Sequence, residues 1–202
     1  MEIFKIFDEN QKVIGLAPRE EVHRLGLWHE TFHCWLVDTS NRMIYMQLRS
    51  ENKKDYPGLF DITAAGHLLH TESEVDGVRE LEEELGIKVP FSDLTKLNTI
   101  TCSIENEKIK DHEFAHVYAY MSEQGFKNFS LQVEEVAGMV HCSVDDFEAL
   151  WLGEKDQIEV NGFKIDEING KIAISQLVNE EQFVIRDKSY YLEVVQKIKS
   201  LL

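Results

Sequence analysis

The chain has 202 residues, enough for one substantial hydrophobic core, and its 21 Lys+Arg against 37 Asp+Glu give a formal net charge of −16. So acidic a chain repels nucleic acid phosphates and anionic membranes, and we expect neither as a partner. The N-terminus does not resemble a signal peptide, no apolar run approaches ~20 residues, and the three cysteines lie far apart, so we expect a cytoplasmic protein without a disulfide framework.

The first part of the chain predicts two hairpins and a short helix. Residues 3–17 alternate around a polar Asp-Glu-Asn-Gln turn, which is typical of a β-hairpin. Residues 18–26 predict a short helix, because a proline stands at the start and a glycine lies beyond the end. The β-rich stretches 31–38 and 42–50 are separated by Thr-Ser-Asn and indicate a second hairpin.

The middle of the chain predicts a turn at 55–61, an acidic helix from about Ser73 to Leu85 that ends at Gly86, and a helix at 144–152. Further strands are expected at 87–90, 97–104, 112–122 and 134–143.

The last fifty residues are expected to form a hairpin region followed by a helix. The Asn-Gly pairs at 161–162 and 169–170 each indicate a hairpin turn. The apolar residues of 189–202 recur with the spacing of an amphipathic helix. No repeat or low-complexity linker is present. We therefore expect one domain, residues 1–150, with a C-terminal extension, residues 151–202, packed on it.

The stretch RELEEELG (79–86) places several acids on one turn of the predicted helix. At about 100° per residue, Glu80, Glu83 and Glu84 share one face, whereas Glu82 points roughly 160° away. Three carboxylates without a neighbouring lysine suit a hard divalent cation such as Mg²⁺. A solvated acidic face is the alternative, since like charges four residues apart cost a helix only ~0.2–0.5 kcal/mol per pair.

The residues before this helix favour the metal site. The segment GHLLHTESEVDGVRELEEELGI (66–87) resembles the signature of the Nudix family, G-x5-E-x7-R-E-U-x-E-E-x-G-U, in which U is apolar. The matching positions are Gly66, Glu72, Arg79, Glu80, Leu81, Glu83, Glu84, Gly86 and Ile87. One residue is missing between Glu72 and Arg79, which shortens the junction of loop and helix. The resemblance implies an α/β fold, a Nudix-type α/β/α sandwich around a mixed central sheet, with an N-terminal β-hairpin and a C-terminal helical extension.

The resemblance also implies hydrolysis of a diphosphate linked to a moiety X, with Mg²⁺ or Mn²⁺ as cofactor. Glu80, Glu83 and Glu84 would hold the metal, which neutralises the diphosphate and acidifies a bound water, and we expect Glu80 and Glu83 to be catalytic. Glu135, ahead of a strand, is the candidate for the carboxylate that takes the water proton. Structural or orienting roles are expected for the remaining motif residues, Gly66, Glu72, Arg79 and Gly86.

Other stretches resemble one branch of the family, which includes isopentenyl diphosphate isomerase. Histidines and acids lie where that enzyme has metal ligands, and imply a second metal site: His23, His29, His67, Asp111 and Glu113. Histidine with carboxylate is a suitable ligand set for a divalent cation. Arg49 and Lys53 lie like its diphosphate-binding residues, and would form the basic pocket that a phosphate needs in so acidic a chain.

Two departures separate the chain from the isomerase. Ala65 stands where the isomerase needs a cysteine, and Glu80 and Glu83 are both acidic where the isomerase motif is degraded. We therefore expect a hydrolase of a small-molecule diphosphate, such as a nucleoside diphosphate derivative. An isomerase of prenyl diphosphates and a non-catalytic diphosphate-binding module remain alternatives. Residues 153–202 match nothing in the resemblance, and both covering the pocket and forming a homodimer are open roles for them.

Overall fold

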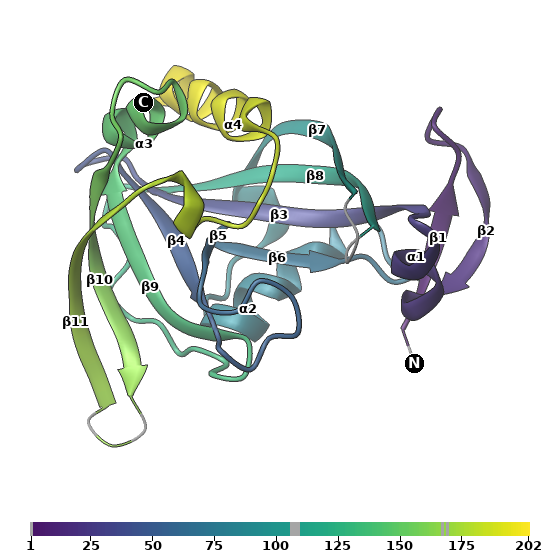
Figure 1. Ribbon diagram of the computed structural model, residues 1–202, viewed down its shortest axis with the longest axis horizontal. Coiled ribbons are helices and arrows are strands. Elements are labelled where there is room, and N and C mark those ends of the chain that lie inside the picture. The colour runs from purple at the N-terminus through teal and green to yellow at the C-terminus, as the bar shows by residue number, and fades with distance from the viewer. Residues whose placement is uncertain (1, 106–109, 167, 169) are drawn as a thin grey trace.

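The computed structural model describes residues 2–105, 110–166, 168 and 170–202, and these form one sheet of 11 strands with helices on both faces (Figure 1). The strands are β1 (Ile3–Phe7), β2 (Val13–Pro18), β3 (Trp28–Asp38), β4 (Met43–Arg49), β5 (Phe60–Asp61), β6 (Ala64–His67), β7 (Leu94–Glu105), β8 (Lys110–Ser122), β9 (Val136–Ser143), β10 (Ile158–Asp166) and β11 (Gly170–Val178). The helices are α1 (Arg19–Leu25), α2 (Arg79–Leu85), α3 (Val144–Trp151) and α4 (Lys188–Leu201), with short 3-10 turns at Asp76–Val78, Phe91–Asp93 and Glu180–Gln182.

The sheet is mixed, which confirms the expected α/β/α sandwich. Strand β3 runs parallel to β8, and the other strand pairs are antiparallel. Helices α3 and α4 cover one face and α2 lies against the other (Figure 1). Alternate residues of β3 supply the two cores: Trp35 packs with α3 and α4, whereas Phe32 and Leu36 pack with α2.

The expected N-terminal hairpin and short helix are present as β1, β2 and α1, and they stand at one end of the sheet (Figure 1). The expected helix after residue 153 is also present, since α4 buries Tyr191, whose ring stacks on Trp151 at 3.8 Å between centroids. Strand β10 extends the sheet by pairing with β9. The division of the chain at residue 150 stays a prediction. None of the helices in the described residues is long and apolar enough to span a membrane.

Two local predictions are wrong. Asn161 and Gly162 lie inside β10 instead of in a turn, because a Cβ at position 162 would overlap the backbone of Met139 in the neighbouring strand. The second Asn-Gly pair falls partly outside the described residues. Residues 87–90 do not form a strand, since the N–H of Ile87 donates back to the carbonyl of Leu81 at 2.9 Å and closes the end of α2.

The acidic helix also begins later than predicted, at Arg79 instead of near Ser73. The carboxylate of Asp76 accepts hydrogen bonds from the Ser73 backbone N–H at 2.9 Å and from its hydroxyl at 2.8 Å. These bonds hold the segment in a turn, and a 3-10 turn then leads into α2. The helix ends as predicted at Gly86, which takes a φ of 70° that favours glycine.

Candidate active site

Arg79, the first residue of α2, binds the acids of the motif together. It donates two hydrogen bonds to the Glu72 carboxylate, from Nε at 2.8 Å and from Nη2 at 3.1 Å, and its Nη1 donates to Glu80 at 2.6 Å and to Glu83 at 3.0 Å. The pair with Glu72 joins the loop to the helix despite the missing residue between them. The backbone N–H of Leu69 also donates to Glu72, at 2.8 Å, so both ends of the loop are fixed.

Glu80 lies against Gly66 on strand β6. A Cβ at position 66 would overlap the Glu80 carboxylate, so only glycine permits this approach. Glu80 is 8% exposed, and burial raises its pKa to about 7, while Arg79 opposes that shift. A buried acid that titrates near neutral pH is typical of a site that binds a cation or moves a proton.

Glu84 lies on the same inward side of α2. It accepts hydrogen bonds from the Gln47 side chain and from the Ala65 backbone N–H, both at 3.3 Å. Burial, and then the neighbouring Glu80, raise its pKa well above the ordinary value. Leu81 and Leu85, on the opposite face, are fully buried in the core.

Glu83 and Glu82 differ in what they face, not in how exposed they are. Both side chains are 54% exposed, and each accepts an ion pair at 3.0 Å, Glu83 from Arg79 and Glu82 from Lys88. Glu83 therefore lies at the rim of the acid group, whereas Glu82 belongs to the outer surface. The assignment of helix faces made from the sequence agrees with this placement.

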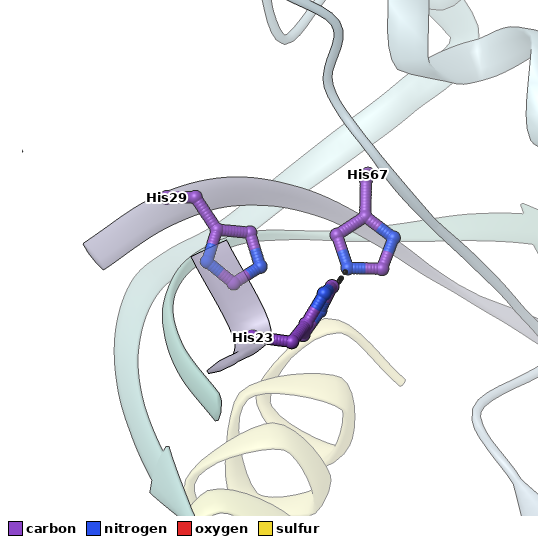
Figure 2. A group of neighbouring side chains, drawn as sticks. All are labelled: His23, His29 and His67. Atoms are coloured by element: carbon purple, nitrogen blue, oxygen red, sulfur yellow. Dashed lines mark hydrogen bonds between the residues drawn. The ribbon is translucent and has the colours of Figure 1, made fainter. Parts of the chain in front are cut away.

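Three histidines from separate elements meet beside this helix, and Figure 2 shows their rings turned toward one another. His23 comes from α1, His29 from β3 and His67 from β6, and the Nε2 atoms of His23 and His67 are 3.2 Å apart. Burial lowers the pKa of His29, and lowers that of His67 well below its usual range. Both imidazoles are thus neutral at physiological pH, which is the form that binds metals.

Two carboxylates complete the cluster because β8 lies parallel to β3. Glu113 is the register partner of His29, and Asp111 Oδ1 lies 3.5 Å from His29 Nε2 and 3.8 Å from His23 Nε2. Among the described residues, His29 Nε2 and Asp111 Oδ1 are buried without a hydrogen-bond partner. Ligand atoms of His29, Asp111 and Glu113 lie within 4.8 Å of one another, a set that fits a divalent cation.

The acids of α2 converge less closely. In the described part of the chain, two groups of side chains bring potential ligand atoms within 4.8 Å of one another, and both contain His29: one with His23 and His67, the other with Asp111 and Glu113. Glu80 and Glu83 instead bind Arg79, as described above. Arg79 bonds one oxygen of each carboxylate, Glu80 Oε1 and Glu83 Oε2.

The basic residues expected to bind diphosphate already have protein partners. Arg49 donates to the Asp61 carboxylate at 2.9 Å and to the backbone carbonyls of Asp55 at 2.8 Å and Tyr56 at 3.0 Å. Lys53 pairs with the carboxylate of Glu135, the residue expected to act as base. The structure thus brings Lys53 and Glu135 together, and places Arg49 as a support for the loop that precedes β5.

Sequence reasoning missed Asp61 and Arg186. The Arg186 guanidinium lies 3.4 Å from Glu113 and 3.6 Å from Asp61, although Arg186 belongs to the C-terminal extension. Asp61 is the last residue of the predicted turn and belongs to none of the motifs. No local pattern marks either residue, because their proximity arises from pairing between distant segments.

The comparisons with known proteins agree with the geometry. The model of the NUDIX domain family matches residues 27–160. A Nudix hydrolase of Clostridium acetobutylicum is 34% identical over 98% of this chain and 97% of its own length. Nudix hydrolase 3 of Arabidopsis thaliana is 32% identical over 72% of this chain but only 20% of its own length. An isopentenyl-diphosphate Delta-isomerase of Burkholderia multivorans is 31% identical over 56% of this chain and 63% of its own length.

Solved structures show the same fold. The structure of DR0079 from Deinococcus radiodurans has a TM-score of 0.56 at 16% identity, and covers 76% of this chain and 91% of its own. A MutT/nudix family protein of Enterococcus faecalis has a TM-score of 0.51 at 10% identity, and covers 85% of this chain and 62% of its own. The family match, the relative that spans nearly the whole chain and the motif around α2 lead to one conclusion: this chain belongs to the Nudix hydrolase family, the pyrophosphohydrolases.

Proposed function

We propose that the protein hydrolyses a diphosphate linkage in a small molecule, such as a nucleoside diphosphate derivative, with Mg²⁺ or Mn²⁺ as cofactor. The observation that carries the proposal is the acid group on α2. Glu80 and Glu84 are buried on its inward side, Glu83 lies at the rim, and Gly66 leaves room for the Glu80 carboxylate. Burying carboxylates costs free energy unless a cation compensates them, and Arg79 touches only two of the three.

The residues of the site have separate roles in this reaction. Glu80, Glu83 and Glu84 hold the divalent cation, which when bound neutralises the diphosphate and makes a coordinated water more acidic. Glu135 accepts the proton of the attacking water, and its ion pair with Lys53 holds the carboxylate in place. Arg79 and Glu72 fix the helix against its loop, so that the acids keep their direction. His29, Asp111 and Glu113, which we call the His–carboxylate group, form a second place for a cation.

The expected surroundings of the protein remain part of the proposal. The three cysteines are free and buried, which suits a reducing cytoplasm. The net charge of −16 supports a small-molecule partner and opposes nucleic acid and membrane surfaces. A homodimer stays a prediction.

A screen of diphosphate compounds tests the proposal. The purified chain is incubated with nucleoside diphosphate derivatives, dinucleotides, prenyl diphosphates and phosphorylated cofactors, with Mg²⁺ or with EDTA, and released phosphate and monophosphates are measured. We expect cleavage of at least one class, lost in EDTA and in Glu80→Gln. Cleavage that persists in both would contradict the assignment to α2, and tight binding of a diphosphate without cleavage would favour a non-catalytic binding module.

A further inference from the structure

Six buried side-chain polar atoms of the described residues have no hydrogen-bond partner, and four of them belong to the His–carboxylate group or to residues linked to it through Asp61 and Arg49. These four are His29 Nε2, Asp111 Oδ1, Tyr56 Oη and Arg186 Nε. Buried polar groups are nearly always satisfied, so such atoms in linked residues indicate a missing ligand. A cation satisfies His29 and Asp111, as the site geometry already suggests. Tyr56 and Arg186 are instead hydrogen-bond donors, and donors require an acceptor or an anion.

Tyr56 is held in place by its own loop. Its φ is 53°, an uncommon conformation for a bulky side chain, and Arg49 binds the carbonyls of Asp55 and Tyr56. Strained backbone that neighbouring groups maintain in this way is found mainly at ligand sites. Arg49 also donates to the Asp61 carboxylate, which lies 3.6 Å from the Arg186 guanidinium, so the Tyr56 loop and Arg186 adjoin the same carboxylate. The pKa of the Tyr56 hydroxyl is raised by burial, so it remains a protonated donor.

Arg186 is placed by the C-terminal extension. Phe183 forms a parallel bridge with Phe60 of β5, and the N–H of Val184 donates to the Phe60 carbonyl at 2.9 Å. This pairing carries the Arg186 side chain, only 9% exposed, to Asp61 and Glu113. Its contacts with those carboxylates, at 3.6 and 3.4 Å, are longer than the 2.7–2.9 Å typical of charge-assisted hydrogen bonds. The Nε atom of the same guanidinium is buried without a hydrogen-bond partner in the described residues, so one of its donors is left for a further acceptor.

We propose that the Tyr56 hydroxyl and the Arg186 guanidinium together bind a phosphoryl oxygen of the diphosphate, beside the His–carboxylate group. This inference rests on the proposed function, and it replaces Arg49 and Lys53 as the direct contacts. Arg49 and Lys53 are positioning residues, since Arg49 holds the Tyr56 loop and Lys53 holds Glu135. Guanidinium matches the geometry of phosphate oxygens, and a hydroxyl donor beside it adds direction. The C-terminal extension thereby supplies part of the substrate site.

Binding of methylenediphosphonate, which cannot be hydrolysed at its bridging carbon, measures this subsite without catalysis. The probe is titrated by calorimetry in the presence of Mg²⁺ against the full chain, Tyr56→Phe and Arg186→Lys. Tyr120→Phe and Arg42→Lys are matched controls outside the site, since Tyr120 packs on Phe126 and Arg42 pairs with Asp145. Losing one hydrogen bond to a charged acceptor weakens binding by about 10- to 100-fold. We expect that loss in the two site variants and no change in the controls.

A second measurement separates anion binding from damage to the metal site or to the fold. Mn²⁺ affinity, followed by electron paramagnetic resonance without the diphosphonate, should be the same in Tyr56→Phe as in the parent chain, and thermal melting should show that each variant is folded. Unchanged diphosphonate affinity in Tyr56→Phe and Arg186→Lys would overturn the inference, as would equal loss of Mn²⁺ affinity. If the parent chain cleaves diphosphates while both variants bind and cleave normally, the inference fails and the proposed function stands. If diphosphonate affinity depends on Tyr56 and Arg186 but the parent chain cleaves no diphosphate, the inference stands and the proposed function fails.

Discussion

The carboxylate of Glu80 occupies the space that a side chain at Gly66 would fill. This contact joins the first glycine of the motif to the first glutamate of its helix, residues that lie on β6 and α2. Glycine is required at position 66 because of this close contact, and not because of an unusual backbone conformation. Any larger residue must displace Glu80, Arg79 or the strand itself.

Gly66→Ala should therefore impair the site more than the fold. Inserting a methyl group into packed surroundings costs about 1–3 kcal/mol, whereas a misplacement of about 1 Å in a catalytic group can reduce the rate about 10²-fold. We expect kcat for diphosphate cleavage to fall by about that factor, with a modest decrease in melting temperature. Gly15→Ala is the control, because a Cβ there meets only ordinary contacts with Ile6 at 3.6 Å. Equal losses in both variants would refute the role of the close approach.

Glu83→Gln and Glu82→Gln form a matched pair of substitutions. Both side chains are 54% exposed and each has one ion pair at 3.0 Å, so the structural cost should be the same and small. Of these two residues, only Glu83 belongs to the group of acids formed with Glu80 and Glu84. We expect the kcat of Glu83→Gln to fall by about 10²–10⁴-fold, the range for a catalytic acid–base group. Glu82→Gln should keep nearly full activity. Steady-state kinetics at saturating Mg²⁺ decide the matter, and similar kcat values would show that the faces of α2 are assigned wrongly.

The local features of this molecule were predictable from sequence because local chemistry determines them. The spacing of apolar residues predicts which side of α2 faces the core, and Gly86 marks its end. The start of α2 was missed because the Ser73–Asp76 pair closes a turn instead of capping the helix. Asn161–Gly162 was misread because a glycine needed for close strand packing looks the same in sequence as one in a turn.

The non-local part of the site could not be derived in this way. The histidines and acids were found through a family resemblance, since only the parallel pairing of β3 and β8 brings His29 to Glu113. Arg186 reaches Asp61 through a single bridge between Phe60 and Phe183 that no periodic pattern announces. Sequence predicts a site role for Arg49, but it does not predict the ion pair of Arg49 with Asp61. Sequence thus identifies functional residue types more readily than it identifies their partners.

Without metal, the ionisation of Glu80 should destabilise the protein as pH rises. Its pKa is raised from 4.5 in the unfolded chain to about 7 in the folded one, so the folded state holds more protons between these values. Stability then decreases with pH across this window, by at most about 3 kcal/mol for such a shift. The Glu80→Gln variant lacks this carboxyl, so its stability does not contain this pH-dependent contribution.

The melting temperature of Glu80→Gln in EDTA should therefore rise relative to the parent chain from pH 5 to pH 7.5 and stay level above that. Comparing the two proteins cancels the opposite contributions of buried His29 and His67, whose pKa values are lowered. Added Mg²⁺ should stabilise the parent chain more than the variant at pH 8, because it binds the ionised carboxylate. A difference in melting temperature that does not vary with pH would mean that Glu80 is not the titrating acid.

Removing His29 should abolish one class of Mn²⁺ site. His29 belongs both to the group with His23 and His67 and to the group with Asp111 and Glu113, so His29→Gln disrupts both. Mn²⁺ titration followed by electron paramagnetic resonance should show one site fewer per chain. His112→Gln is the control, because His112 alternates with Asp111 and Glu113 along β8 and packs on Trp28 at 4.8 Å between ring centroids. The same stoichiometry in the parent chain and His29→Gln would exclude a metal at this cluster.

Isomerisation of isopentenyl diphosphate should be absent or very slow. Moving a double bond needs an acid on one face of the substrate and a base on the other, and each such group contributes about 10²–10⁴-fold. Glu113 is available for one role, but Ala65 stands where the resemblance to the isomerase implies a cysteine, and its methyl side chain has no ionisable atom. The cysteines elsewhere are unsuitable, since burial raises the pKa of the Cys102 thiol to about 12 and raises those of Cys34 and Cys142 further.

Hydrolysis, by contrast, requires only a cation, a water and a base, for which Glu80, Glu83, Glu84 and Glu135 are present. Incubation with isopentenyl diphosphate in heavy water, followed by NMR, should thus show no deuterium uptake at a catalytic rate, while an authentic isomerase run in parallel incorporates it. Uptake by the parent chain would overturn the hydrolase assignment and point to Tyr56 as the missing acid, because its hydroxyl is buried without a hydrogen-bond partner in the described residues. Loss of that uptake in Tyr56→Phe, with the diphosphonate still bound, would then assign the proton transfer to that hydroxyl.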